Sequence, residues 1–169
     1  LALKKKKKHY TGFLYVGLMI IKNEPYLIEY NVRMGDPECQ AILPRLNTDF
    51  VKIIDAATNN KINKIKIKWK KIKCMSIVLC SKGYPGQYSK NKLIKNIEKM
   101  KLKYDSFIFH AGTKLINNKL FSNGGRVLNI VTRSNHFKSA REDTLELLNE
   151  INWENGFYRK DMGYKVIEE

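Results

Sequence analysis

Three polar side chains at every second position of one short segment are the residues best suited to chemistry. Glu29, Asn31 and Arg33 lie in or directly after residues 26–32, whose composition favours a β-strand. Because side chains alternate across a strand, the three would share one face at intervals of about 6.5 to 7 Å. A carboxylate and an amide oxygen at that spacing can both reach one hard cation such as Mg²⁺, which usually takes phosphate oxygens as well.

An acidic turn, Gly35-Asp36-Pro37-Glu38, follows this strand directly. Arg33 would lie beyond the cation, where its guanidinium can hold a phosphate or a carboxylate through two hydrogen bonds. Gly35 lets the backbone approach a ligand, and the two acids add carboxylates at the rim. An ordinary strand with a solvated polar face would also explain E-x-N-x-R alone. The rigid acidic turn favours a functional site.

The surrounding pattern predicts the elements that must position these residues. They are strands over 13–21 and 26–32 joined by a four-residue turn, a short helix over 38–43 capped by Asp36, a helix over 50–57 capped by Asn47 or Thr48, strands over 74–80, 106–110 and 126–132, a hairpin over 114–120 turning at Asn117-Asn118, and a helix over 137–151 capped by Ser134 or Asn135. Residues 59–73 form either a lysine-rich linker or an exposed edge strand.

The order of these elements predicts an α+β fold. We expect residues 1–60 to form a first domain that carries the polar hairpin, residues 61–72 a linker or edge segment, and residues 73–169 a second domain. That second domain would be a small, mostly antiparallel sheet with one packed helix.

Composition restricts the classes of function. Hydrophobic residues make up 43% of the 169 residues, which suits a packed core rather than a disordered chain. No apolar run reaches the roughly 18 residues that span a bilayer, so we expect no membrane partner. The net charge of +16 is compatible with nucleic-acid binding. Because lysine greatly outnumbers arginine and recurs with Asn and Ile, we favour a solvated surface.

The chain has three cysteines, Cys39, Cys74 and Cys80. An odd number without a C-x-x-C pair indicates neither a disulfide framework nor a zinc site. Cys74 and Cys80 lie in an apolar run and are expected in the core. A reducing, cytoplasmic setting follows from this usage.

Six ordered segments resemble the phosphoribosylamine–glycine ligase (glycinamide ribonucleotide synthetase) family, part of the ATP-grasp superfamily. The resemblance extends over about residues 10–167, almost the whole chain. The segments are residues 10–19, residues 28–40, Gly83-Tyr84-Pro85-Gly86, His110-Ala111-Gly112-Thr113, Asn123-Gly124-Gly125-Arg126-Val127-Leu128 and residues 157–164.

The resemblance implies a reaction in which ATP phosphorylates glycine and the amine of 5-phosphoribosylamine then displaces phosphate. By matching the family's motif, Glu29 and Asn31 would be the ligands of Mg²⁺ or Mn²⁺. Arg33 and Asp36 are expected to act on the substrate side as catalytic residues. The loop Asn123-Gly124-Gly125-Arg126 is expected to be cofactor-binding and, with the segment 110–113, to face the same cleft. His110 itself fits a structural histidine better.

The family's chain is much longer than this one. We therefore expect the carboxy-terminal portion of such a ligase, inactive without an amino-terminal part that would hold the nucleotide. The basic run Lys4–Lys8 matches none of the family's motifs. Two alternatives stay open: a basic nucleic-acid-binding module, suggested by charge alone, and a non-catalytic gene remnant.

Overall fold

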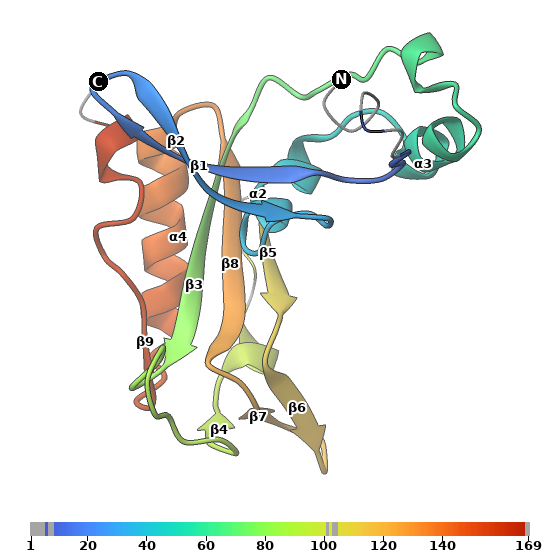
Figure 1. The fold of residues 1–169 in the computed structure, drawn as a ribbon. Helices are drawn as coiled ribbons and strands as arrows, with labels where there is room; N and C mark the ends of the chain where they lie inside the picture. The colour runs from blue at the N-terminus through green and yellow to red at the C-terminus, as the bar shows by residue number, and fades with distance from the viewer. Residues whose placement is uncertain (1–5, 7–8, 101, 103–104, 168–169) are drawn as a thin grey trace. The chain divides into compact units, whose positions relative to one another are not determined.

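The computed structural model describes residues 6, 9–100, 102 and 105–167. Leu1-Ala2-Leu3 and, apart from Lys6, the basic run therefore lie outside the described residues. Two compact units make up the chain (Figure 1): Leu1–Cys39 with Leu46–Lys70, and Gln40–Arg45 with Lys71–Glu169. Short helices combine with antiparallel sheets, so the α+β prediction is confirmed.

The first unit contains a β-hairpin of β1 (Tyr15–Ile21) and β2 (Glu24–Asn31). The predicted four-residue turn is wrong, because only Lys22 and Asn23 connect the strands. Both have positive φ, 50° and 66°, which is the conformation of two-residue hairpin turns whose twist matches that of the strands. Pro25 consequently lies inside β2, where it pairs with Ile20.

A β-bulge interrupts the hairpin. Gly17 pairs with Glu29 but Leu18 pairs with Leu27, so Ile28 is the extra residue on β2. A bulge breaks the alternation of side chains between the two faces. Glu29 and Asn31 both lie after the bulge, and they therefore keep a common face.

A short helix α2 (Glu38–Ile42) and a 3-10 turn η1 (Leu43–Arg45) follow the acidic turn. The helix α3 (Phe50–Thr58) is capped by Asp49, whose side chain accepts a hydrogen bond from the Lys52 amide at 3.1 Å. The predicted caps Asn47 and Thr48 are therefore wrong. The Thr48 hydroxyl instead accepts a hydrogen bond from the Lys68 amide at 2.7 Å.

That bond ties down the lysine-rich segment after α3. This segment carries a 3-10 turn, η2 (Ile62–Lys64), and a single bridge between Leu46 and Trp69. The residues of this segment form no edge strand in the described part of the chain, and its role as a linker between two domains stays a prediction.

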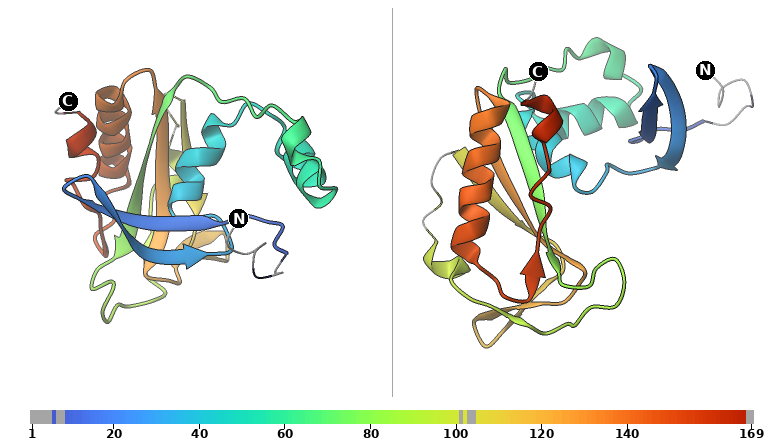
Figure 2. Two further views of the ribbon diagram at one scale, coloured as in Figure 1. Left: turned by 45° about the horizontal axis from the view of Figure 1, so that its top comes forward. Right: turned by 90° about the vertical axis from the view of Figure 1, so that its left-hand side faces the viewer.

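The second unit is built on a four-stranded antiparallel sheet of order β5-β8-β3-β9. Its strands are β3 (Lys73–Ser81), β5 (Asp105–His110), β8 (Arg126–Ser134) and β9 (Gly156–Phe157). A helix, α4 (Phe137–Ile151), lies along one face of β3 and β8 (Figure 2). Its cap position is His136 rather than the predicted Ser134 or Asn135.

The core of this unit lies between α4 and that face of the sheet. Met75, Ile77 and Leu79 alternate along β3 and are buried, as their spacing of two requires. The partners from the helix and from β8 are Ala140, Leu147, Leu148, Ile151, Leu128 and Ile130. Cys80 is buried, as predicted, whereas Cys74 is only half-buried.

A smaller antiparallel sheet of order β4-β7-β6 completes the second unit. The hairpin of β6 (Thr113–Ile116) and β7 (Lys119–Ser122) turns at Asn117 and Asn118, as predicted, with both residues at positive φ. Strand β4 (Leu93–Ile94) and the 3-10 turns η3 (Ile97–Lys99) and η4 (Tyr164–Val166) were not predicted. Among the described residues, none of the helices has the length and apolar character needed to cross a membrane.

Candidate functional site

The hairpin places a carboxylate and an amide on one face. Asn31 pairs directly with Tyr15, and Glu29 pairs directly with Gly17. Directly opposed residues of an antiparallel pair project to the same side. A Cβ on Gly17 would lie 3.0 Å from Glu29 Cγ, so the glutamate side chain extends over this glycine. The two expected metal ligands therefore share a face, with Tyr15 beside them.

Arg33 departs from this face. Strand β2 ends at Asn31, and Arg33 lies in the bend that follows. Its Nη1 donates a hydrogen bond to the carbonyl oxygen of Met34 at 2.8 Å. The expectation of three aligned side chains is therefore wrong for Arg33, because the chain leaves strand geometry before reaching it.

The acidic turn is fastened to the hairpin. The hydroxyl of Tyr15 donates a hydrogen bond to Glu38 Oε1 at 3.1 Å. Gly35 is buried, and a Cβ there would lie 2.3 Å from Glu38 Oε2 and 3.1 Å from Tyr15 Cε2. The amide of Cys39 donates to the Gly35 carbonyl at 2.9 Å, which closes the turn onto α2. Asp36 is half-buried within this turn.

Negative charge gathers around the Tyr15 phenol. The hydrogen bond to Glu38 raises the pKa of Tyr15 above its usual value, and burial and the charges of Glu38 and Glu29 raise it further. The hydroxyl therefore keeps its proton and acts as a donor at neutral pH. The glutamate on the strand and the glutamate of the turn both act on one phenol.

The donor set of the hairpin fits a hard cation that is bound partly by substrate. Within the described part of the chain, no three His, Cys, Asp or Glu side chains form a group that could hold a metal by themselves. Glu29 and Asn31 supply one carboxylate and one amide oxygen on a common face. Magnesium typically takes few protein ligands and completes its shell with phosphate oxygens and water.

The expected cofactor-binding loop lies at the end of the sheet in the second unit. The Asn123 amide donates to the Gly112 carbonyl at 2.7 Å, and the Gly112 amide donates to the Arg126 carbonyl at 2.9 Å. A Cβ on Gly112 would lie 2.6 Å from the Cα of Gly124. Two of the predicted motifs, 110–113 and 123–126, are therefore in direct backbone contact.

A third motif joins this cluster. The ring of Tyr84 covers Gly125 so closely that a Cβ there would lie 2.1 Å from Tyr84 Cδ2. Ser81 fixes the same loop, since its amide donates to the Gly125 carbonyl at 2.7 Å and its hydroxyl to the Gly124 carbonyl at 2.8 Å. Residues 81–86, 110–113 and 123–126 thus form one assembly, which we call the glycine-loop cluster.

His110 has a structural contact at the edge of this cluster. Its Nδ1 lies 3.0 Å from the hydroxyl oxygen of Thr113, at the other side of the tight turn through Ala111 and Gly112. An exposed histidine that closes its own turn agrees with the structural role expected for it.

Sequence reasoning missed Tyr15 and Ser81. Ser81 is the last residue of β3 and looks like an ordinary small residue before a turn. Tyr15 would have been found from the hairpin register, because a two-residue turn at Lys22 and Asn23 brings Tyr15 opposite Asn31. A four-residue turn misplaces that register.

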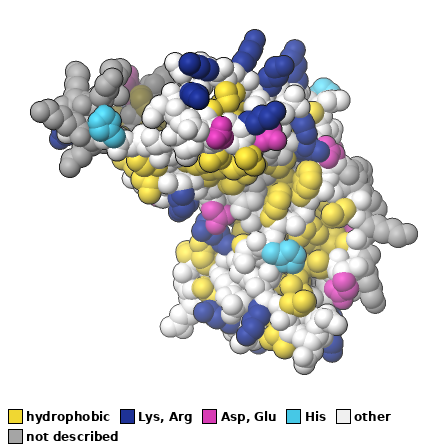
Figure 3. All heavy atoms as spheres, turned by 90° about the vertical axis from the view of Figure 1, so that its right-hand side faces the viewer, with side chains coloured by type: hydrophobic (Ala, Val, Ile, Leu, Met, Phe, Trp, Pro, Cys, Tyr) yellow, Lys and Arg dark blue, Asp and Glu magenta, His cyan; other side chains and the backbone are white. Residues whose placement is uncertain are grey.

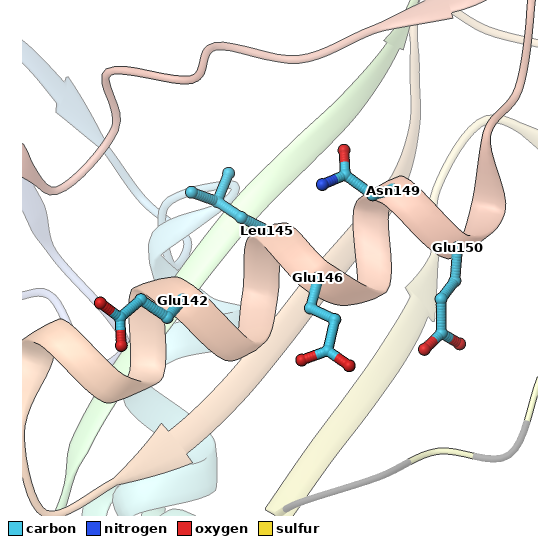
Figure 4. A pocket seen from close by; sticks show the side chains of 5 residues that line it. All are labelled: Glu142, Leu145, Glu146, Asn149 and Glu150. Carbon is cyan, nitrogen blue, oxygen red and sulfur yellow. The ribbon is translucent and has the colours of Figure 1, made fainter.

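A separate hollow lies on the outer side of α4 (Figure 4). It is lined by one face of this single helix: Glu142, Leu145, Glu146, Asn149 and Glu150. The carboxylates recur at helical spacing, and the hydroxyl of Tyr158 donates to Asn149 Oδ1 at 2.7 Å. A solvated helix face accounts for this arrangement.

Two family models match the chain in order. The phosphoribosylglycinamide synthetase ATP-grasp (A) domain matches residues 1–39, and the phosphoribosylglycinamide synthetase C domain matches residues 74–165. The first match contains the hairpin and the acidic turn, and the second contains the glycine-loop cluster.

Individual known proteins are similar to this chain over the same residues. A phosphoribosylamine–glycine ligase of Caldanaerobacter subterraneus is 43% identical over 161 residues, and one of Fusobacterium nucleatum is 41% identical over 162 residues. Each alignment covers 95% of this chain and 38% of the relative, so the chain spans well under half of their length. The crystal structure of the ligase from Thermotoga maritima superposes with a TM-score of 0.77 at 34% identity, over 94% of this chain and 39% of that one.

Proposed function

Because the chain belongs to the phosphoribosylglycinamide synthetase family, we propose that the native protein joins glycine to 5-phosphoribosylamine in purine biosynthesis. The products are glycinamide ribonucleotide, ADP and phosphate. The observation that carries the proposal is the common face of Glu29 and Asn31 beside the acidic turn, within the part of the chain that matches the ATP-grasp domain.

The chemistry divides into two transfers. A glycine carboxylate oxygen attacks the γ-phosphorus of ATP, which releases ADP and forms the mixed anhydride glycyl phosphate. The amine of 5-phosphoribosylamine then attacks the carbonyl carbon, phosphate leaves, and the nitrogen loses a proton. Phosphoryl transfer depends mainly on positioning and on charge neutralisation, so the residues around the phosphates decide the rate.

We propose that Glu29 and Asn31 hold the divalent cation, Mg²⁺ or Mn²⁺, which neutralises charge on the phosphoryl group when it is bound. Asp36, from the acidic turn, would line the substrate side, and Arg33 would join it there only if its guanidinium leaves the Met34 carbonyl. The loop Asn123-Gly124-Gly125-Arg126 would contact ATP or the phosphorylated substrate. Gly124 packs against Gly112 and Gly125 lies under the Tyr84 ring, so close packing at the glycines fixes the backbone of this loop.

The organisation of the chain is part of the proposal. We assign residues 1–60 to the end of the ATP-grasp domain, residues 61–72 to a linking segment and residues 73–169 to the carboxy-terminal domain. Nucleotide contacts from the remaining length of the family's proteins would complete the site, so residues 1–169 alone should give no turnover. Three thiols without a disulfide fit a cytoplasmic enzyme.

The test is ADP release by the native protein that depends on both glycine and 5-phosphoribosylamine. Glu29→Ala and Asn31→Ala should each lower kcat at a fixed, limiting concentration of Mg²⁺ and raise the concentration of metal needed for half-maximal activity. Loss of one charged ligand interaction is expected to cost about 2 to 4 kcal/mol. Glu29→Ala should have the larger effect, because it removes a charge.

Glu24→Ala is the matched control, since Glu24 is an exposed glutamate at the opposite end of the same strand. It should retain the activity and the metal dependence of the unmodified protein. Near-normal turnover of both ligand variants at saturating Mg²⁺, together with unchanged Mn²⁺ binding, would rule out the metal assignment. Absence of glycine-dependent ADP release by the unmodified protein would rule out the reaction.

A further inference from the structure

The phenol of Tyr15 connects two parts of the hairpin site that are far apart in sequence. Tyr15 is on β1 opposite Asn31, and its hydroxyl donates to Glu38 Oε1 at 3.1 Å. Glu38 is the first residue of α2, so its carboxylate would otherwise be free to turn into solvent. This hydrogen bond keeps a third polar group beside the face of Glu29 and Asn31.

Gly35 also helps to hold the Glu38 carboxylate in this position. Its missing side chain leaves room for the second carboxylate oxygen, since a Cβ would lie only 2.3 Å from Glu38 Oε2. The Tyr15 ring lies against the other side of that space, with Cε2 at 3.1 Å from the Cβ position. Oε1 of Glu38 therefore accepts a hydrogen bond from the Tyr15 hydroxyl, and Oε2 lies over Gly35.

The substrate of the proposed reaction needs a group of this kind. The carboxylate of an α-amino acid must reach the phosphates near Glu29 and Asn31. Its ammonium group is only one carbon away, so it must come close to the same face. An ammonium removed from water needs a negative or acceptor partner. Glu38, which lies beside this face, is a carboxylate that the metal assignment does not use.

We propose that Tyr15 is a positioning residue that holds the Glu38 carboxylate to receive the ammonium group of the amino-acid substrate. The proposal rests on the ligase function proposed above. It assigns recognition of the amine to the acidic turn and leaves the cation to the strand. Tyr15 acts only through Glu38, because its hydroxyl proton is already donated to that carboxylate.

The phenol suits this task for a physical reason. The hydroxyl of Tyr15 is an uncharged hydrogen-bond donor, and it donates to Glu38 Oε1 at 3.1 Å. A neutral donor orients a carboxylate without cancelling its charge. The negative charge of Glu38 therefore remains available for an ammonium ion.

The experiment is a steady-state analysis of the native protein with the variants Tyr15→Phe, Glu38→Gln and both together. Glu38→Gln should raise the KM for glycine by about tenfold or more, the effect of losing a hydrogen bond to a charged group. Tyr15→Phe should raise the same KM by about three- to tenfold. The double variant should resemble Glu38→Gln, because the phenol acts through the carboxylate.

The KM for 5-phosphoribosylamine and the dependence on Mg²⁺ should stay unchanged in all three variants. Tyr30→Phe is the control, since Tyr30 is an exposed tyrosine that pairs with Val16 on the other face of the hairpin. If the variants lower kcat and thermal stability and raise the KM of every substrate alike, the contact is merely structural and the proposal is overturned. A shift in Mg²⁺ dependence in place of the glycine KM would also overturn it, by making Glu38 a metal ligand.

These outcomes are separate from failure of the ligase function. The unmodified protein must first release ADP in response to glycine. If it releases ADP and the KM for glycine does not change in Glu38→Gln, the ligase proposal is retained and the role proposed for Tyr15 and Glu38 is refuted.

Discussion

Backbone contacts between glycines set the geometry of the glycine-loop cluster. At Gly112 a Cβ would lie 2.6 Å from both the Arg126 carbonyl oxygen and the Gly124 Cα. Main-chain atoms of a paired strand cannot move aside as a flexible side chain can. The prediction is that Gly112→Ala lowers the free energy of unfolding by about 2 to 4 kcal/mol.

Urea denaturation followed by circular dichroism measures this change. Gly86→Ala is the control, because its Cβ would meet only the Gly83 carbonyl oxygen, at 3.2 Å. It should cost less than about 1 kcal/mol. Equal stability of the two variants would contradict the close backbone approach.

Burial governs the reactivity of the thiols. Desolvation raises the pKa of Cys74 to about 11, against smaller opposing effects of Arg133 and Arg45. Burial also raises the pKa of Cys39 and Cys80. Since the thiolate is the nucleophile, only about one Cys74 in a thousand would be reactive at pH 8.

The prediction is slow labelling of the folded protein by a disulfide reagent at pH 8, with rates that rise steeply toward pH 11. Unfolding in urea should make three thiols react at once. The absorbance of the released aromatic thiol measures both. Rapid labelling of Cys74 in the folded protein would show that its surroundings admit water.

Single residues also show how far the sequence could predict the site. Residue type and a spacing of two sufficed to place Glu29 and Asn31 on one face, because no bulge lies between them. Arg33 failed because the strand ends two residues earlier, and strand ends depend on the pairing of β1 with β2. Tyr15 could not be assigned a partner, because its bond to Glu38 joins residues 23 positions apart in the chain.

At the scale of elements, the turn of the hairpin is a point of local strain. Lys22 adopts φ of 50°, a conformation that costs most side chains about 1 kcal/mol and is better tolerated by asparagine. Lys22→Asn should therefore stabilise the hairpin by about 0.5 to 1 kcal/mol. Hydrogen exchange of the β1 and β2 amides should slow by about two- to fivefold.

Lys119→Asn is the comparison, because Lys119 is in extended strand β7 and should gain nothing. Unchanged exchange in Lys22→Asn would mean that the turn does not limit the opening of the hairpin.

A buried hydroxyl pair fastens α4 to the sheet. The hydroxyl oxygens of Thr132 on β8 and Thr144 on α4 lie 2.6 Å apart, and each is also within hydrogen-bond distance of the Ala140 carbonyl, so two protons are shared among three contacts. Both residues are fully buried. Thr132→Val should cost about 1 to 2 kcal/mol of stability, because it removes a hydroxyl from an enclosed polar group.

A double-mutant cycle with Thr144→Val checks the network by urea denaturation. The double variant should lose less than the sum of the single variants, since an all-valine pair leaves fewer polar atoms unmatched. Strict additivity would show that the two hydroxyls act independently.

The elements themselves were largely predictable where periodicity was strong. Strand β3 and helix α4 follow from alternating and helical spacing of apolar residues. Caps and connections were less predictable: Asp49 rather than Thr48 caps α3, because Thr48 bonds to Lys68, 20 positions away. Strand β4 has two residues and exists only because β7 provides its partner.

At the scale of the whole molecule, the net charge and the apolar surface suggest different kinds of partner. The net charge is +16, yet on the face drawn in Figure 3 the Lys and Arg side chains are spread in small groups while hydrophobic side chains gather in broad patches. Nucleic-acid grooves usually concentrate their cations along one path. The dispersed lysines on this face favour the solvated-surface interpretation that the sequence suggested.

The hairpin accounts for much of the exposed apolar surface. Leu18, Ile20, Tyr26, Ile28 and Tyr30 are each at least half exposed. Exposed apolar side chains in this number on a soluble chain mark an interface or an association site. The prediction is that residues 1–169, produced alone at tens of micromolar, form dimers or larger species through β1 and β2. Light scattering coupled to size-exclusion chromatography measures the mass.

Placing charges on this surface should reverse the association. Ile20→Lys with Ile28→Lys adds two positive side chains to exposed positions on neighbouring strands, which makes burial of the hairpin against a second copy costly. The double variant should elute at the mass of one chain, 19.7 kDa, with its circular dichroism retained. A matched double lysine substitution at Leu115 and Ile116, which are exposed on the second unit, should leave the association unchanged. A monomeric unmodified chain would show that the apolar side chains of the hairpin tolerate water without a partner.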